Sequence, residues 1–153
     1  MGMNTMIQRI KSEYGEVIVA PTNAGKSRTM LLDAIEYAKE GRNVFYITDE
    51  ASVERTMKHM THIYDGDFDG EVLPLNIELM SVEYGQGIHV IEKIVQSYND
   101  ITESDKPNIV IMYDCPARAL YDLHEIEKLV DGTNIMLNTA IQSKRPRGYD
   151  YEN

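Results

Sequence analysis

The stretch Val-Ile-Val-Ala-Pro-Thr-Asn-Ala-Gly-Lys-Ser-Arg-Thr-Met-Leu-Leu-Asp, residues 17–33, decides the fold that the sequence predicts. It begins with apolar β-forming residues, passes through a loop that holds Pro21 and Gly25, and continues with apolar residues at helical spacing. Gly41 then favours the end of the helix. The apolar residues that fall on one helix face are Met30, Leu31, Ala34, Ile35 and Ala38. The pattern predicts a strand, a tight loop and a helix in direct succession.

The loop in this stretch nearly matches the Walker A pattern for phosphate binding, G-x-x-x-x-G-K-[ST], although Ala20 replaces its first glycine. Backbone N–H groups at the start of a helix attract phosphate. We expect Lys26 to reach the β and γ phosphates and the Ser27 hydroxyl to bind Mg²⁺. The predicted ligands are therefore ATP and Mg²⁺. The expected nucleotide contacts are Pro21, Thr22, Asn23, Ala24, Gly25, Lys26, Ser27 and Arg28.

The composition predicts one soluble domain, because 153 residues with 42% hydrophobic side chains suffice for a core. No run of about 18 apolar residues and no signal-peptide core occurs, so we expect a cytoplasmic protein without a membrane partner. The single cysteine, Cys115, excludes an internal disulfide. The formal charge of −10 argues against a protein that covers nucleic acid by charge alone, although residues 144–147 form a basic patch.

Strands and helices alternate along the rest of the chain. The strands are expected at Glu16–Val19, Asn43–Thr48, Leu75–Met80, Ile109–Tyr113 and Asn134–Leu137, and the later helices at Ser52–Tyr64, Ile88–Ile101 and Ala117–Val130, the last with Leu120 facing inward. Alternation predicts an α/β fold of three layers with a mainly parallel sheet of about five strands and ligands at the carboxyl ends. We assign residues 1–14 to an N-terminal extension, 15–148 to the domain and 149–153 to a tail.

Two carboxylates follow predicted strands. Asp114 comes directly after the apolar run at 109–113, the Walker B arrangement in which a buried strand presents a carboxylate to Mg²⁺. A helix cap is the alternative role. Glu50 follows the strand at 43–48 and is our candidate general base for water. Its alternative role is a favourable acidic residue at the start of the next helix.

Two histidines, His59 and His62, lie one turn apart on the helix expected at 52–64. They could hold a metal ion, but no third ligand has suitable spacing. We therefore interpret them as a pair of surface residues.

In the order of its phosphate loop, the strand before Glu50 and the strand before Asp114, the chain resembles the RecA-like ATPase core of DnaB-type replicative helicases and their RecA and KaiC relatives. The likeness covers residues 15–148 and rests on four segments: Ala20-Pro21 at the loop, Ile47–Ser52 around Glu50, Leu75–Leu79, and the strand before Asp114. The resemblance implies Mg²⁺-dependent ATP hydrolysis in DNA replication or recombination. It also implies single-stranded DNA and a homo-oligomer or a larger replication protein as partners.

The resemblance further implies a polar sensor of the γ-phosphate after the last strand, at Asn138, Thr139 or Gln142, of which Asn138 and Gln142 are favoured. It implies an arginine that reaches a neighbouring subunit's nucleotide, for which Arg145 and Arg147 are the clustered candidates; a solvated basic tail is the alternative. The extra strands and DNA-binding loops of a full helicase motor are largely missing. We therefore expect a minimal or trimmed member, perhaps from a phage or mobile element.

Two other functions remain open. Residues 21–27 are also similar to the loop of thymidine kinases, but that family's zinc-binding cysteines are missing, and Asp114 is followed here by Cys115-Pro116. Phosphoryl transfer to a nucleoside would identify a kinase. A regulatory module that binds nucleotide without turnover is the non-enzymatic alternative.

Overall fold

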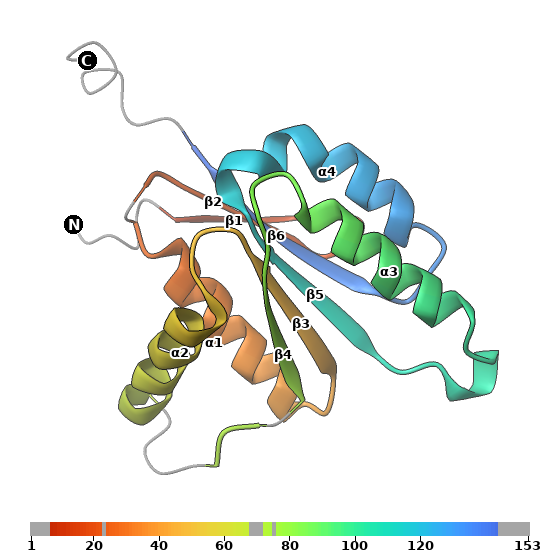
Figure 1. The fold of residues 1–153 in the computed structure, drawn as a ribbon, viewed down its shortest axis with the longest axis horizontal. Coiled ribbons are helices and arrows are strands. Elements are labelled where there is room, and N and C mark those ends of the chain that lie inside the picture. The colour runs from red at the N-terminus through yellow and green to blue at the C-terminus, as the bar shows by residue number, and fades with distance from the viewer. Residues whose placement is uncertain (1–6, 23, 68–71, 75, 144–153) are drawn as a thin grey trace.

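The computed structural model describes residues 7–22, 24–67, 72–74 and 76–143 (Figure 1). The described elements, in chain order, are β1 (Gln8–Lys11), β2 (Glu16–Ala20), α1 (Lys26–Lys39), β3 (Asn43–Thr48), α2 (Val53–Asp67), β4 (Ile77–Ser81), α3 (Gly87–Asn99), the 3₁₀ helix η2 (Glu103–Asp105), β5 (Ile109–Asp114), α4 (Pro116–Val130) and β6 (Met136–Gln142). Within this part of the chain, no helix combines the length and apolar character needed to cross a membrane.

The six strands form one sheet in the order β1-β2-β6-β5-β3-β4. All neighbouring pairs are parallel except β1 with β2. Helices α1 and α2 cover one face of the sheet and α3 and α4 the other (Figure 1). The α/β class and the mainly parallel sheet are thus confirmed. The last strand of the chain, β6, lies between β2 and β5, which are themselves distant from each other in sequence.

Strand β1 was not foreseen, and it raises the number of strands to six. It lies within the expected N-terminal extension, and its four residues are exposed, so its sequence lacks the apolar alternation that indicates a strand. It pairs antiparallel with β2, Gln8 opposite Val19. The Arg9 guanidinium also forms ion pairs with Glu16 and Asp33, both at 2.8 Å. We therefore attribute this strand to its pairing with the edge of β2 and not to its residue pattern.

The last strand differs from its expected position at 134–137. Strand β6 extends to Gln142 because Asn138 and Thr139 lie buried inside the sheet. Thr139 stands opposite Val17 of β2 and Tyr113 of β5. These two polar residues interrupt the apolar run in the sequence. Their backbone N–H and C=O groups are nevertheless satisfied, because β6 pairs with β2 on one side and with β5 on the other. The prediction placed the end of this strand too early.

The inward face of α4 was also predicted incorrectly at one position, since Leu120 is 68% exposed. Asp122 is buried instead, and its carboxylate accepts hydrogen bonds from the Tyr113 hydroxyl at 3.0 Å and from Arg118 Nε at 3.1 Å. A buried carboxylate with such partners is tolerated at a core position. The inward residues of α4 are Pro116, Ala119, Asp122, Ile126 and Val130.

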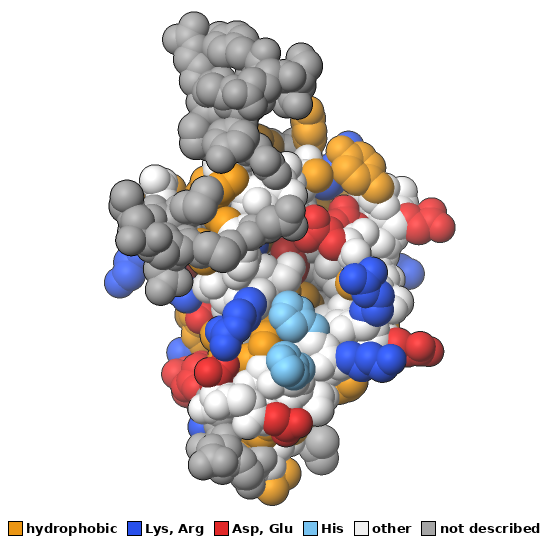
Figure 2. Space-filling view, turned by 90° about the vertical axis from the view of Figure 1, so that its left-hand side faces the viewer, with side chains coloured by type: hydrophobic (Ala, Val, Ile, Leu, Met, Phe, Trp, Pro, Cys, Tyr) orange, Lys and Arg blue, Asp and Glu red, His pale blue; other side chains and the backbone are white. Residues whose placement is uncertain are grey.

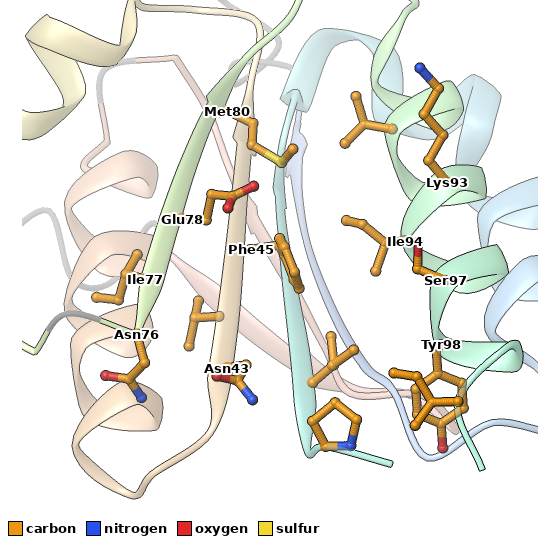
Figure 3. Close-up of a pocket in the computed structure, with 15 residues that line it drawn as sticks. Asn43, Phe45, Asn76, Ile77, Glu78, Met80, Lys93, Ile94, Ser97 and Tyr98 are labelled. Carbon is orange, nitrogen blue, oxygen red and sulfur yellow. The ribbon is translucent and has the colours of Figure 1, made fainter. Parts of the chain in front are cut away.

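A groove of about 670 Å³ lies between α3 and the strands β3 and β4 (Figure 3). Phe45 and Met80 extend from the strands toward α3, which contributes Ile94 and Tyr98. The groove lies on the sheet face opposite α1 and α2. It is therefore separate from the site described next.

Candidate functional site

The residues expected to bind phosphate and metal converge at the carboxyl ends of the central strands. Register explains the convergence, because Ala20 at the end of β2 lies opposite Gln142, and Thr48 at the end of β3 lies opposite Asp114. The loop that leads from β2 into α1, residues 20–27, is called the Lys26 loop here. Its described residues meet the tips of β3, β5 and β6, where parallel α/β sheets commonly bind ligands.

The backbone of the Lys26 loop explains why only one of its two expected glycines is needed. Ala20 is the last residue of β2 and is extended and buried, so a side chain is accommodated there. Gly25 is the N-cap of α1 and has φ of 89°, a conformation that favours glycine. The departure from the Walker A pattern at Ala20 therefore does not prevent the loop from folding back toward the helix.

Lys26 crosses the loop, and its ammonium group is held by loop carbonyls. Nζ donates hydrogen bonds to the Ala20 oxygen at 3.2 Å and to the Pro21 oxygen at 3.0 Å. The residue is only 7% exposed, and burial lowers the pKa of the ammonium group, while the charges of Glu50 and Asp114 act in the opposite direction. The lysine ammonium group thus lies at the loop, and its hydrogen-bond partners there are uncharged carbonyl oxygens. An anion at the loop would therefore not have to displace a carboxylate from it.

Ser27, Asp114 and Tyr46 form a buried hydrogen-bonded group. Asp114 Oδ2 accepts from the Ser27 hydroxyl at 2.9 Å and from the Tyr46 hydroxyl at 2.6 Å. Asp114 Oδ1 is buried and has no hydrogen-bond partner among the described residues. Burial raises the pKa of Asp114, while the two hydroxyl donors and the charges of Lys26 and His59 lower it. One carboxylate oxygen is therefore left unsatisfied by the described residues.

This group fits Mg²⁺ by its chemistry, because Mg²⁺ prefers oxygen ligands and commonly binds one or two carboxylates together with substrate phosphates and water. Ser27 and Asp114 supply a hydroxyl and a carboxylate oxygen within one hydrogen-bonded unit. In the described part of the chain, no cluster of three or more His, Cys, Asp or Glu residues is suited to a metal. A cation here would depend on phosphate and water for its remaining ligands.

Glu50 lies at the same edge, in the turn between β3 and α2. It borders both the cavity beside the Lys26 loop and the cavity above Ser27 and Asp114. Partial burial raises the pKa of the Glu50 carboxyl, and the negative charges of Asp114 and Asp49 raise it further. A carboxylate with a raised pKa accepts a proton more readily near neutral pH. Its position and basicity suit the role of general base.

The two favoured sensor candidates are separated by the structure. Gln142 borders the cavity of the Lys26 loop together with Lys26 and Ser27. Asn138 lies four residues earlier on β6, about 13 Å along the strand, and its Oδ1 accepts from the Glu16 N–H at 2.7 Å. Its amide nitrogen lies 3.4 Å from the Met112 sulfur. Of the two residues, only Gln142 borders this cavity, so it is the better placed candidate for the γ-phosphate sensor, which stays a prediction.

Several site residues were missed by the sequence analysis. Tyr46 lies two residues before the end of β3, and no motif indicated that its hydroxyl would reach Asp114. The cavity above Ser27 and Asp114, about 300 Å³ in volume, also receives Thr48, Arg55 and His59. Arg55 and His59 lie four residues apart on α2, so their common orientation was predictable, but the cavity that they border together with Thr48 was not.

The remaining candidates fall into two groups. Thr22 borders the cavity of the Lys26 loop, and so does Arg28, whose guanidinium also pairs with Asp67 at 2.7 Å. Asn23, Arg145 and Arg147 lie outside the described residues. A second subunit's arginine therefore stays a prediction.

Comparisons with known proteins add no family to this description. No protein-family model and no curated protein sequence matches the chain. The functional assignment therefore rests on the geometry of the Lys26 loop, the Ser27–Asp114 pair and Glu50.

Proposed function

We propose that the chain is a small RecA-like P-loop ATPase, of the kind found in DnaB-type cores, that binds ATP with Mg²⁺ and hydrolyses it. The observation that carries the proposal is the buried Ser27–Asp114 hydrogen bond of 2.9 Å beside Lys26, with Asp114 Oδ1 unpartnered among the described residues. A buried carboxylate without partners on one oxygen is costly. Such an arrangement is reasonable where a ligand supplies the missing interaction.

Strand order gives additional support. The strand before the Lys26 loop, β2, and the strand that ends in Asp114, β5, are separated by β6 alone. The tip of β6 therefore lies between the two halves of the site, and Gln142 borders the cavity of the Lys26 loop. This is the place where a polar group can respond to a terminal phosphate.

Each residue has a role in the proposed reaction. Loop N–H groups and Lys26 bind the β and γ phosphates and stabilise negative charge as it develops. Ser27 and Asp114 would hold Mg²⁺, which supplies charge neutralisation on the phosphate oxygens when bound. Glu50 accepts the proton of the attacking water, and Gln142 donates a hydrogen bond to the terminal phosphate.

The experiment that tests this proposal is steady-state ATP turnover with Mg²⁺, with and without single-stranded DNA. We expect turnover that Lys26→Ala reduces at least about 100-fold, because the main cation at the phosphates is lost. Lys128→Ala, an exposed change on α4, is the matched control and should retain full activity. Equal turnover in wild type and Lys26→Ala would contradict the proposal.

The wider role is proposed from the family resemblance alone. Its partners would be single-stranded DNA and further copies of this chain or a larger replication protein, in replication or recombination. DNA-stimulated turnover and a nucleotide-dependent increase in size by light scattering are the expected results. A monomer with turnover indifferent to DNA would limit the function to ATP hydrolysis.

A kinase is the second candidate, and one observation favours it. The cavity of about 300 Å³ beyond Ser27 is bordered by Glu50, Arg55 and Asp114, and its volume is near the lower limit for a small ligand. An acceptor hydroxyl placed there would lose its proton to Glu50. Analysis of the products separates the two candidates, since a kinase yields a phosphorylated nucleoside and the ATPase yields inorganic phosphate.

A further inference from the structure

His59 borders three cavities around the expected phosphate site. It faces the cavity above Ser27 and Asp114, the cavity of the Lys26 loop, and a third cavity between Arg28 and the end of α2. The first two cavities share three residues, Ser27, Glu50 and His59. Figure 2 shows histidine side chains near the centre of one face of the molecule, with Lys or Arg side chains on both sides.

The His59 imidazole is available to a ligand. No hydrogen bond of this ring occurs within the described part of the chain, whereas the His89 ring lies 3.0 Å from Glu92. Partial burial and the nearby charges of Arg28 and His62 lower the pKa of His59. A neutral imidazole still carries one N–H and can donate one hydrogen bond.

The negative charges around the shared space favour a hydrogen-bond donor there. Glu50 and Asp114 both border the cavity that lies above Ser27, and both carboxylates would repel a terminal phosphate. Lys26 approaches from the loop, through bonds to Ala20 and Pro21. His59 borders the cavity of the Lys26 loop from α2. The two donors therefore line the same cavity as Ser27 and Glu50.

We propose that His59 donates a hydrogen bond to the γ-phosphate and thereby makes the site distinguish ATP from ADP. This inference rests on the proposed function and adds a specificity residue to it. We expect the γ-phosphate, and not the β-phosphate, to reach the space shared by Ser27, Glu50 and His59, so that the contact would form only with the triphosphate. Helix α2 then takes part directly in nucleotide recognition.

The test measures dissociation constants for a non-hydrolysable ATP analogue and for ADP, both with Mg²⁺, by calorimetry on the full chain. In His59→Ala we expect the analogue to bind about tenfold more weakly, the typical loss for a hydrogen bond to a charged group, and ADP to bind as in wild type. His59→Arg restores a donor and should recover most of the affinity for the analogue. His89→Ala is the matched control and should leave both constants unchanged.

Unchanged values of both constants in His59→Ala would overturn this inference while leaving the proposed ATPase intact. A proportional loss of both ligands in that variant would also overturn it, because the contact would not be specific to the γ-phosphate. Failure of the wild type to bind either nucleotide would instead overturn the proposed function. Lys26→Ala, which should lose both ligands, shows that the assay reports the expected site.

Discussion

Two buried polar side chains on the neighbouring strands β5 and β6 lie at different heights in the sheet and differ in how their atoms are satisfied. Asn138 lies near the start of β2, where its oxygen accepts from the Glu16 N–H and its nitrogen contacts the Met112 sulfur. Asp114, at the carboxyl end, has one oxygen bonded to Ser27 and Tyr46 and the other unpartnered among the described residues. Buried polar groups in folded proteins are usually satisfied.

The difference is the one expected between a residue with a structural role and a residue that binds a ligand, as we propose for Asp114. Asn138 stabilises the pairing of β2 with β6, and it needs nothing from outside the chain. Burial raises the pKa of Asp114, which shows that the folded protein disfavours the charge there. The buried Asp114 carboxylate is thus unfavourable for folding, whereas the hydrogen-bonded Asn138 amide is satisfied.

The largest effect is expected from Asp114→Asn. We expect turnover to fall on the order of 1000-fold, because the carboxylate at the metal is lost. The free energy of unfolding should rise by about 1 kcal/mol, since the buried charge is removed while a hydrogen-bond acceptor remains. ATP turnover and urea unfolding measure the two effects. A variant that is both inactive and less stable would show that Asp114 is a structural residue like Asn138.

The same variant tests how stability depends on pH. The pKa of Asp114 is raised above its ordinary value of 3.8, so the folded state holds this proton more tightly than the unfolded state. Its contribution to the unfolding free energy therefore falls as pH rises from 3.8 through the raised pKa, and it is unfavourable at neutral pH. The stability gain in Asp114→Asn should be larger at pH 7 than at pH 4. An equal gain at both values would contradict the raised pKa.

The next largest effect is expected from Asn138→Ala. Loss of the side chain leaves the Glu16 N–H without its partner and opens a cavity, so the free energy of unfolding should fall by about 2–3 kcal/mol. Nucleotide affinity should stay within about twofold of wild type, because the residue lies away from the Lys26 loop. Chemical denaturation and calorimetry provide the two numbers. A selective loss of ATP binding would restore Asn138 as a sensor.

A smaller effect is expected from Gln142→Ala at the site end of β6. Turnover should fall about tenfold, because one hydrogen bond to the terminal phosphate is lost. Stability should change by less than about 0.5 kcal/mol, since the side chain is partly exposed at the end of the strand. Gln142→Glu, which keeps the size but adds repulsion, should be less active than the alanine variant. Full activity in both variants would remove Gln142 from the site.

The smallest effect is expected from Arg9→Ala. Arg9 pairs with Glu16 and Asp33 and so joins β1 to β2 and α1, but its side chain is partly exposed. We expect a loss of roughly 0.5–1 kcal/mol in unfolding free energy and unchanged turnover. The loss should shrink at high salt, because screening weakens exposed ion pairs. A loss that is independent of salt would point to side-chain packing instead.

The sequence predicted the strands and helices that have a clear period. The apolar run before Asp114 and the helical spacing after Lys26 gave β5 and α1 because each pattern is local. It missed β1, whose residues are polar and exposed, and it ended β6 too early at the buried pair Asn138 and Thr139. In both cases the strand forms through pairing with a neighbouring strand that is distant in sequence. The residue pattern of one segment does not show such pairing.

By itself, the sequence determined that Lys26 and Ser27 begin a helix after a strand, and it predicted which side chains would bind phosphate and metal. Only the tertiary structure decided which of them meet. Asn138 and Gln142 share one face of β6, so alternation along the strand could not distinguish them. Their depth in the sheet depends on the register with β2, which brings Gln142 to Ala20. The same long-range packing places His59 and Tyr46 at the site, because contacts between distant segments leave no periodic signal in either segment.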